Sequence, residues 1–158
     1  MQSKDTYRLE LQQLTASLRA WSGFVADVAR VETEEADSSW RIALTPTAPG
    51  ACPIEIVIDA AQPNCDLRVG GETIENWRLP SLDVVLPMVK AVTEGRVFTR
   101  RVSSAATALP LGVSTHIVLA DGQSIVLPQM PAEDPLAHRV AEARETHYLP
   151  YRKPSGSR

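Results

Sequence analysis

Arg100 and Arg101 are the residues whose type and position most directly indicate chemistry, because they are consecutive arginines in a predicted strand between Thr99 and Val102. A guanidinium group presents a fork of N–H donors that matches a carboxylate or a similar anion. In a regular strand Arg100 shares a face with Phe98 and Val102, since side chains alternate along a strand. The structural alternative, which we favour, is a sheet edge or bulge where the arginine stem covers apolar surface. An anion site at Arg100 and Arg101 is the functional hypothesis.

His116 is the candidate general base. A base needs a nucleophile or a substrate proton within hydrogen-bond reach, and Ser114, Thr115 and Cys65 are conceivable neighbours. The alternative, which we favour, is a partly buried histidine that makes a structural hydrogen bond. His116 therefore joins the two arginines in the predicted ligand-binding set, and the sequence assigns no catalytic residue.

The remaining metal-ligating residue types are poorly spaced for a metal site. His138 and His147 are nine residues apart, which places them about 90° out of phase on a helix of 3.6 residues per turn. The chain also lacks a Gly-rich phosphate loop, His-Glu-x-x-His, Cys-x-x-Cys and Gly-x-Ser-x-Gly. We therefore expect no metal and no cofactor.

Three other residues are candidates for binding a protein partner. Trp77 ends a predicted hairpin, where an exposed indole would anchor a partner. Glu34 and Glu35 belong to an acidic run, residues 32–37, which we expect to be a solvated loop. The structural alternative for the tryptophan is a place in or beside the core.

Composition narrows the function classes. The chain has 158 residues, a net charge of −3 and 5% aromatic residues, which disfavours binding to nucleic acid or to an anionic membrane surface. We expect no signal peptide, no membrane span and a cytoplasmic location. Cys52 and Cys65 are expected to be free thiols, because the predicted strand pairing separates them by about 20 Å.

Gly70-Gly71 and Asp121-Gly122 each lie between runs of alternating apolar residues, which predicts two β-hairpins with two-residue turns. In the first hairpin Leu67 faces Ile74, and the like charges further along predict a bulge or frayed end at Asp66. In the second hairpin His116 faces Leu127, and apolar residues on both faces predict central strands. The other predicted strands cover Trp40–Leu44, Ile54–Ile58 and Val97–Val102.

Helical patterns flank these strands. Apolar spacing predicts one helix over Lys4–Val31, lying on a sheet or, less favoured, forming a coiled-coil seam between two copies of the chain. A second helix is predicted over Asp83–Glu94, with Asp83 as its cap, Pro87 in or just after its first turn and Gly95 just past its end. A short third helix is predicted over Pro135–His147, followed by a flexible tail.

These patterns predict an α+β fold with a single antiparallel sheet of about five or six strands and two helices mainly on one face. Residues 1–128 form the predicted domain, and residues 129–158 hold the short helix and the tail. The leading functional hypothesis is a non-enzymatic protein that acts by binding another protein, as an adaptor, inhibitor or immunity-type protein. The alternative is a small-molecule-binding or catalytic domain that uses Arg100, Arg101 and His116. A homodimer through the N-terminal helix is compatible with either.

Overall fold

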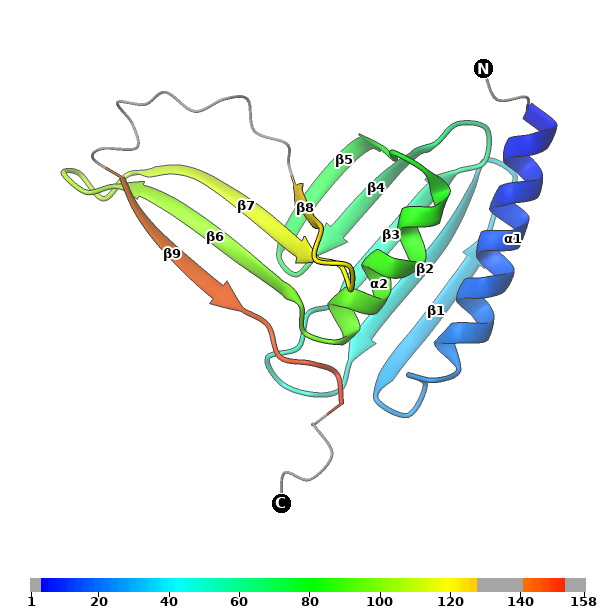
Figure 1. Ribbon diagram of the computed structural model, residues 1–158, viewed down its shortest axis with the longest axis horizontal. Coiled ribbons are helices and arrows are strands. Elements are labelled where there is room, and N and C mark those ends of the chain that lie inside the picture. Colours follow the sequence, from blue (N-terminus) through cyan, green and yellow to red (C-terminus); the bar gives the residue numbers. More distant parts are fainter. Residues whose placement is uncertain (1–3, 128–140, 153–158) are drawn as a thin grey trace.

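The computed structural model describes residues 4–127 and 141–152. Within these residues the chain forms two α-helices, one short 3₁₀-helix (η1) and nine strands (Figure 1). In chain order they are α1 (Lys4–Ser22), β1 (Ala29–Glu35), β2 (Ser39–Pro46), β3 (Ile54–Asp59), β4 (Asn64–Val69), β5 (Glu72–Arg78), η1 (Leu82–Val84), α2 (Val85–Thr93), β6 (Val97–Ser104), β7 (Pro110–Val118), β8 (Ser124–Leu127) and β9 (Ala141–His147).

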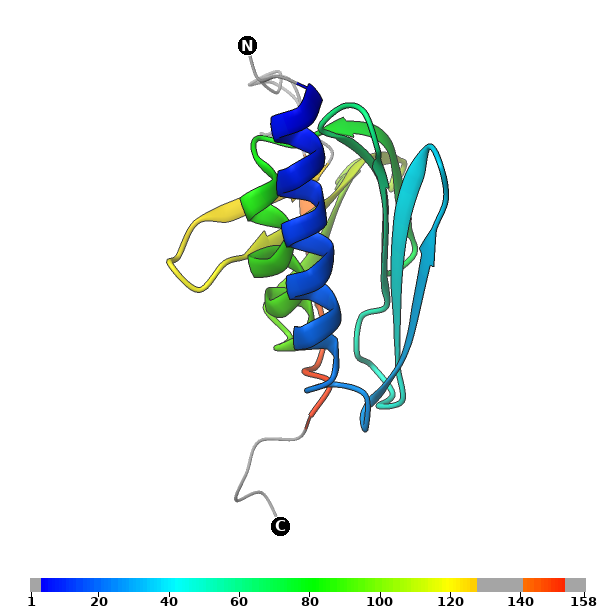
Figure 2. The ribbon, with the colours of Figure 1, turned by 90° about the vertical axis from the view of Figure 1, so that its right-hand side faces the viewer.

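The strands form two antiparallel sheets rather than the single predicted sheet. The large sheet has the order β1-β2-β3-β4-β5, and the small sheet has the order β8-β7-β6-β9. Both α-helices of the described residues lie on the same face of the large sheet, and none of them covers its other face (Figure 2). The α+β class was correctly predicted. The division into two sheets was not, because alternation within a strand does not specify which strand will pair with it.

One hydrophobic core joins these layers. Alternate residues of β2, β3 and β4 point toward the helices and are almost fully buried, as Ile42, Ile56 and Leu67 illustrate. Helix α2 is buried around most of its circumference and contacts both α1 and β7. An apolar helix of this kind is stable only when neighbours cover it on several sides. The position of α2 thus ties the small sheet to the large one.

The first helix ends earlier than predicted. It stops at Ser22, before Gly23, and the chain turns and enters β1 at Ala29. Val25 and Val28 still pack against the core, so the apolar spacing continues through the turn and resembles a longer helix. Residues 32–35 of the acidic run therefore lie in a strand, and the predicted loop there was wrong.

The first hairpin has the predicted register. Leu67 pairs with Ile74, and the register shifts between Cys65 and Leu67. Asp66 lies at this bulge, where its Oδ1 accepts a hydrogen bond of 2.8 Å from the backbone N–H of Asn76, a residue with φ of 53°. The predicted irregularity is confirmed.

The second hairpin is shifted by one residue from the prediction. The Leu119 N–H donates to the Gln123 carbonyl at 2.8 Å, and Gly122 has φ of 89°. The loop therefore contains three residues, of which the last is a left-handed glycine, as in three-residue hairpin loops. His116 consequently pairs with Val126 rather than with Leu127. Strand β8 lies at an edge of the sheet and is not central as predicted.

The second helix begins differently from the prediction. The Ser81 hydroxyl accepts a hydrogen bond of 3.2 Å from the Asp83 N–H and caps η1. The α-helix then starts at Val85, and its N-cap residue Val84 makes no capping side-chain hydrogen bond, so the prediction of Asp83 as the cap was wrong. Pro87 lies in the first turn, as predicted, where its missing N–H has no intrahelical partner to lose. Gly95 follows the helix with φ of 78°.

Residues 141–147 form strand β9, antiparallel to β6, and not part of a helix. The rest of the predicted third helix lies outside the described residues. Residues 149–152 are also not a free tail. Tyr151 is buried and its hydroxyl donates to the Cys52 carbonyl at 2.5 Å, while Arg152 forms an ion pair of 2.7 Å with Asp27. Cys52 and Cys65 are both buried free thiols.

Candidate functional site

The candidate site is one face of the small sheet. Alternation along β6 directs Thr99 into the core, where it is 4% exposed, and Arg100 to the opposite face. We call this opposite face the small-sheet outer face and define it by Phe98, Arg100, Ser114, His116, Glu145 and His147. These residues come from β6, β7 and β9, whose far ends project beyond the large sheet (Figure 1).

Three rings form a row across the small-sheet outer face. Phe98 pairs with His116 on β7 and with His147 on β9. The ring centroids of Phe98 and His116 are 4.7 Å apart with an interplanar angle of 3°. Those of Phe98 and His147 are 4.8 Å apart with an angle of 28°. Such stacking fixes the three side chains relative to one another.

A polar row lies beside the rings. Arg100 pairs with Ser114 on β7 and with Glu145 on β9. The Glu145 carboxylate contacts His147 Nε2 at 3.2 Å. In the described part of the chain Arg100 makes no hydrogen bond or ion pair, and its Nε is buried. The row therefore contains a half-buried cation without a counter-ion among the described residues.

Ser114 and His116 are joined by a hydrogen bond of 2.8 Å between Oγ and Nε2. Burial lowers the pKa of His116, the neighbouring Arg100 lowers it further, and Glu145 acts in the opposite direction. These effects favour the neutral imidazole, which accepts the Ser114 hydroxyl hydrogen when its Nε2 carries no proton. This is the contact that a nucleophile and a general base make. Of the candidate neighbours of His116, the structure places Ser114 beside it.

Arg101 does not belong to the same site as Arg100. It points to the other face of β6, is largely exposed and forms an ion pair of 3.4 Å with Glu72 of β5. The predicted set of Arg100, Arg101 and His116 is thus divided, with only Arg100 and His116 on the small-sheet outer face.

The residues predicted to bind a partner are not brought together. Trp77 lies on β5 and packs, half-buried, against the core, whereas Glu34 and Glu35 lie on β1 at the opposite edge of the large sheet. Glu35 forms an ion pair of 3.5 Å with Arg19 of α1. Partner binding at these residues remains a prediction, but one compact partner surface does not contain all three.

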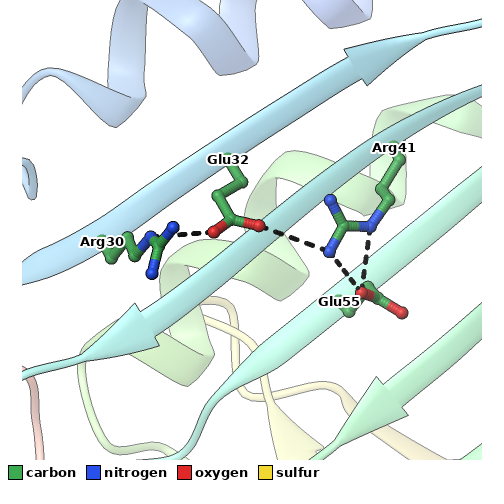
Figure 3. A network of polar contacts seen from close by, with 4 residues as sticks. All are labelled: Arg30, Glu32, Arg41 and Glu55. Carbon is green, nitrogen blue, oxygen red and sulfur yellow. Dashed lines mark hydrogen bonds and ion pairs between the residues drawn. The ribbon is translucent and has the colours of Figure 1, made fainter.

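The uncovered face of the large sheet carries a polar network of Arg30, Glu32, Arg41 and Glu55 (Figure 3). Arg30 Nε lies 2.8 Å from Glu32, whose other oxygen lies 3.6 Å from Arg41. Arg41 donates to Glu55 through Nη2 at 2.7 Å and Nε at 3.0 Å. These charges are paired with one another, so the network stabilises strand pairing and leaves no cation comparable to Arg100.

The main groove of the described residues lies away from the small-sheet outer face. A groove of about 830 Å³ runs between α1 and the segment from β5 to α2, and its lining includes Tyr7, Arg78 and Leu86 but neither Arg100 nor His116. Among residues 4–127 and 141–152, no cluster of three histidine, cysteine or acidic side chains could hold a metal ion. No helix in the same residues is long and apolar enough to cross a membrane.

Comparisons with known proteins gave no relative: no protein-family model matches the chain, and no curated protein or solved structure matches it significantly. The geometry of the small-sheet outer face is therefore the basis for assigning a function. Sequence reasoning missed Phe98, Glu145 and His147 as members of this face. The alternation at Phe98 and Arg100 was visible, but β9 was predicted to be helical, which concealed the third strand.

Proposed function

We propose that the protein is a non-enzymatic binding protein and that it contacts a protein partner through the small-sheet outer face. The observation that carries the proposal is the stacked row of Phe98 with two imidazoles beside Arg100. Aromatic side chains and arginine are enriched at the centres of protein interfaces, because they bury large rigid surfaces and supply directional donors.

The accessibility of the face supports this assignment. The His147 and Glu145 side chains are 62% and 45% exposed, although both belong to ordered strand pairs. Near the turn between β6 and β7, and outside the six residues that define the face, Leu109 and Leu111 are 63% and 48% exposed. A partner that covered this region would remove apolar and aromatic surface from water, which is the main favourable contribution to most associations.

A photo-crosslinking experiment tests the proposal. A benzophenone amino acid replaces Glu145 on the small-sheet outer face or, as a matched control, Glu34 on the large sheet, and each variant is irradiated in the source cells. We expect adducts with a second protein from position 145 and few from position 34. Adducts only from position 34, or none from either position, contradict the proposal.

The hydrogen bond between Ser114 and His116 favours one second candidate, a small-molecule-binding or catalytic site. Within the described residues, Ser114 is the recorded hydrogen-bond partner of His116, so no carboxylate there orients the imidazole as in a catalytic triad. A fluorophosphonate probe distinguishes this candidate from the first. Labelling of the wild-type chain that is lost in Ser114→Ala supports catalysis, and absence of labelling leaves the binding proposal as the better account.

A further inference from the structure

Arg100 is held where it can receive an anion. It lies between Ser114 and Glu145 in the pairing of the small sheet, but Glu145 contacts His147 instead. Within residues 4–127 and 141–152 no acceptor reaches the Arg100 guanidinium, and Nε is shielded from solvent. Because a charged donor is costly to remove from water without an acceptor, binding of an acceptor lowers the free energy more for a partly buried donor than for an exposed one.

The second donor depends on the protonation state of His116. When Nε2 of the imidazole is unprotonated, the Ser114 hydroxyl donates its hydrogen to it across the 2.8 Å contact. When the imidazole is charged, Nε2–H donates to the Ser114 oxygen, and the hydroxyl hydrogen becomes free for a ligand. Protonation of His116 therefore adds a positive charge and releases a hydroxyl donor beside Arg100.

We propose that Arg100, Ser114 and His116 form a binding site for an oxyanion, either a carboxylate or a phosphate group. Arg100 supplies the forked donor, Ser114 supplies the hydroxyl, and His116 takes up a proton as the anion binds. The inference rests on the proposed function in one respect: it names the chemical group that a partner brings to the small-sheet outer face.

The charges around His116 give the site a defined pH dependence. The facing groups are Arg100 on β6 and Glu145 and His147 on β9, while β8 contributes only the uncharged Val126 opposite His116. A bound anion offsets the repulsion between Arg100 and the imidazolium. By linkage, an anion that favours the protonated histidine binds more tightly as the pH falls.

Histidine side-chain NMR with acetate and inorganic phosphate as probes, at constant ionic strength, tests the site. We expect saturable shifts of the His116 signals with millimolar affinity. We also expect the pKa of His116 to rise by roughly half a unit or more at saturation. Tighter binding of acetate would indicate an acidic side chain or carboxyl terminus of the partner, and tighter binding of phosphate a phosphorylated group.

Arg101→Met is the matched control for Arg100→Met, because both variants remove one arginine charge from β6 and only Arg100 lies on the small-sheet outer face. Arg100→Met should weaken anion binding about ten-fold or more, and Arg101→Met by less than about two-fold. If Arg100→Met does not fold, Arg100→Lys retains the charge without the fork and should weaken binding by about three-fold or more.

Two results overturn the inference: no saturable change at His116 with either anion, or equal losses in Arg100→Met and Arg101→Met. The outcome is separable from that of the proposed function. If neither anion binds while position 145 still gives adducts, the oxyanion site is refuted and the interaction surface stands. If an anion binds and position 145 gives no adduct, the oxyanion site stands and the interaction surface is refuted.

Discussion

A substitution at Gly95 tests how residues 148–152 pack against the rest of the protein. It follows α2 in a left-handed conformation, and the hydrogen bonds from Gly95 to the Val92 carbonyl and from Arg96 to the Ala91 carbonyl complete a Schellman motif. A Cβ at Gly95 would lie 2.7 Å from the backbone nitrogen of Pro150. Since backbone cannot move away as a flexible side chain can, Gly95→Ala must displace this segment.

The expected loss of stability in Gly95→Ala has two parts. The left-handed backbone destabilises alanine by about 1 kcal/mol. Displacement of the segment would also expose Tyr151, which is 3% exposed and donates to the Cys52 carbonyl, and loss of a buried aromatic side chain costs about 3 kcal/mol. We therefore expect Gly95→Ala to lower the free energy of unfolding by about 3–4 kcal/mol. Gly122→Ala is the matched control, because its φ is 89° and nothing lies within 4 Å of the added Cβ, so about 1 kcal/mol is expected.

Urea unfolding measures both variants, with Tyr151→Ala as the third arm of a double-mutant cycle. With a slope of about 2 kcal/mol per molar urea, Gly95→Ala should lower the midpoint by about 2 M and Gly122→Ala by about 0.5 M. The double variant Gly95→Ala/Tyr151→Ala should lose about 2 kcal/mol less than the sum of the single losses, because both remove the same contact. Equal effects of Gly95→Ala and Gly122→Ala, or strict additivity with Tyr151→Ala, would refute the reasoning.

Three further predictions concern buried and titrating groups. Thr115 is fully buried and its hydroxyl has no partner in the described part of the chain, so Thr115→Val should raise the free energy of unfolding by about 1 kcal/mol. Thr93→Val should not, because the Thr93 hydroxyl donates to a backbone carbonyl at 2.8 Å; urea midpoints that rank the variants in the opposite order contradict this. Burial raises the pKa of the Cys52 and Cys65 thiols to about 12. A disulfide reagent at pH 8 should therefore label neither thiol in the folded protein and both thiols in urea. Rapid labelling of the folded protein would contradict their burial. Burial, followed by Arg100, lowers the pKa of His116 below its ordinary value, so the unfolded chain binds the proton more tightly than the folded protein does. The contribution of His116 to stability should therefore be full above about pH 6.5 and fall as the pH drops below that value. His116→Gln should remove this part of the pH dependence, and an unchanged pH profile would show that His116 is not its source.

The parts of the fold that depend on local chemistry were predictable. Gly70-Gly71 fixed the first turn, its register and the bulge at Asp66, because a two-residue loop permits few backbone conformations. Gly95 marked the end of α2 for a similar local reason. Asp121-Gly122 was located correctly, but the loop is one residue longer than its dipeptide indicates. That single residue changed every pair in the second hairpin.

The parts that depend on tertiary contacts were not predictable. Residues 141–147 contain alanine, glutamate and arginine, which favour helices, yet they pair with β6 as an edge strand because the β6 backbone offers them a full ladder of hydrogen bonds. For the same reason the row of Phe98 between His116 and His147 was invisible from sequence. Arg100 and His116 were singled out by their residue types and their places in predicted strands, and their juxtaposition required the pairing of β6 with β7.

The most direct test of the central claim is the affinity of Phe98→Ala for the partner captured through position 145. Val57→Ala is the control, since Val57 is a half-buried apolar residue on the uncovered face of the large sheet. Removal of a central aromatic contact should weaken binding by at least about ten-fold, while the control variant binds like the wild type and both remain folded by circular dichroism. Wild-type affinity in folded Phe98→Ala would contradict the assignment of the small-sheet outer face as the interaction surface.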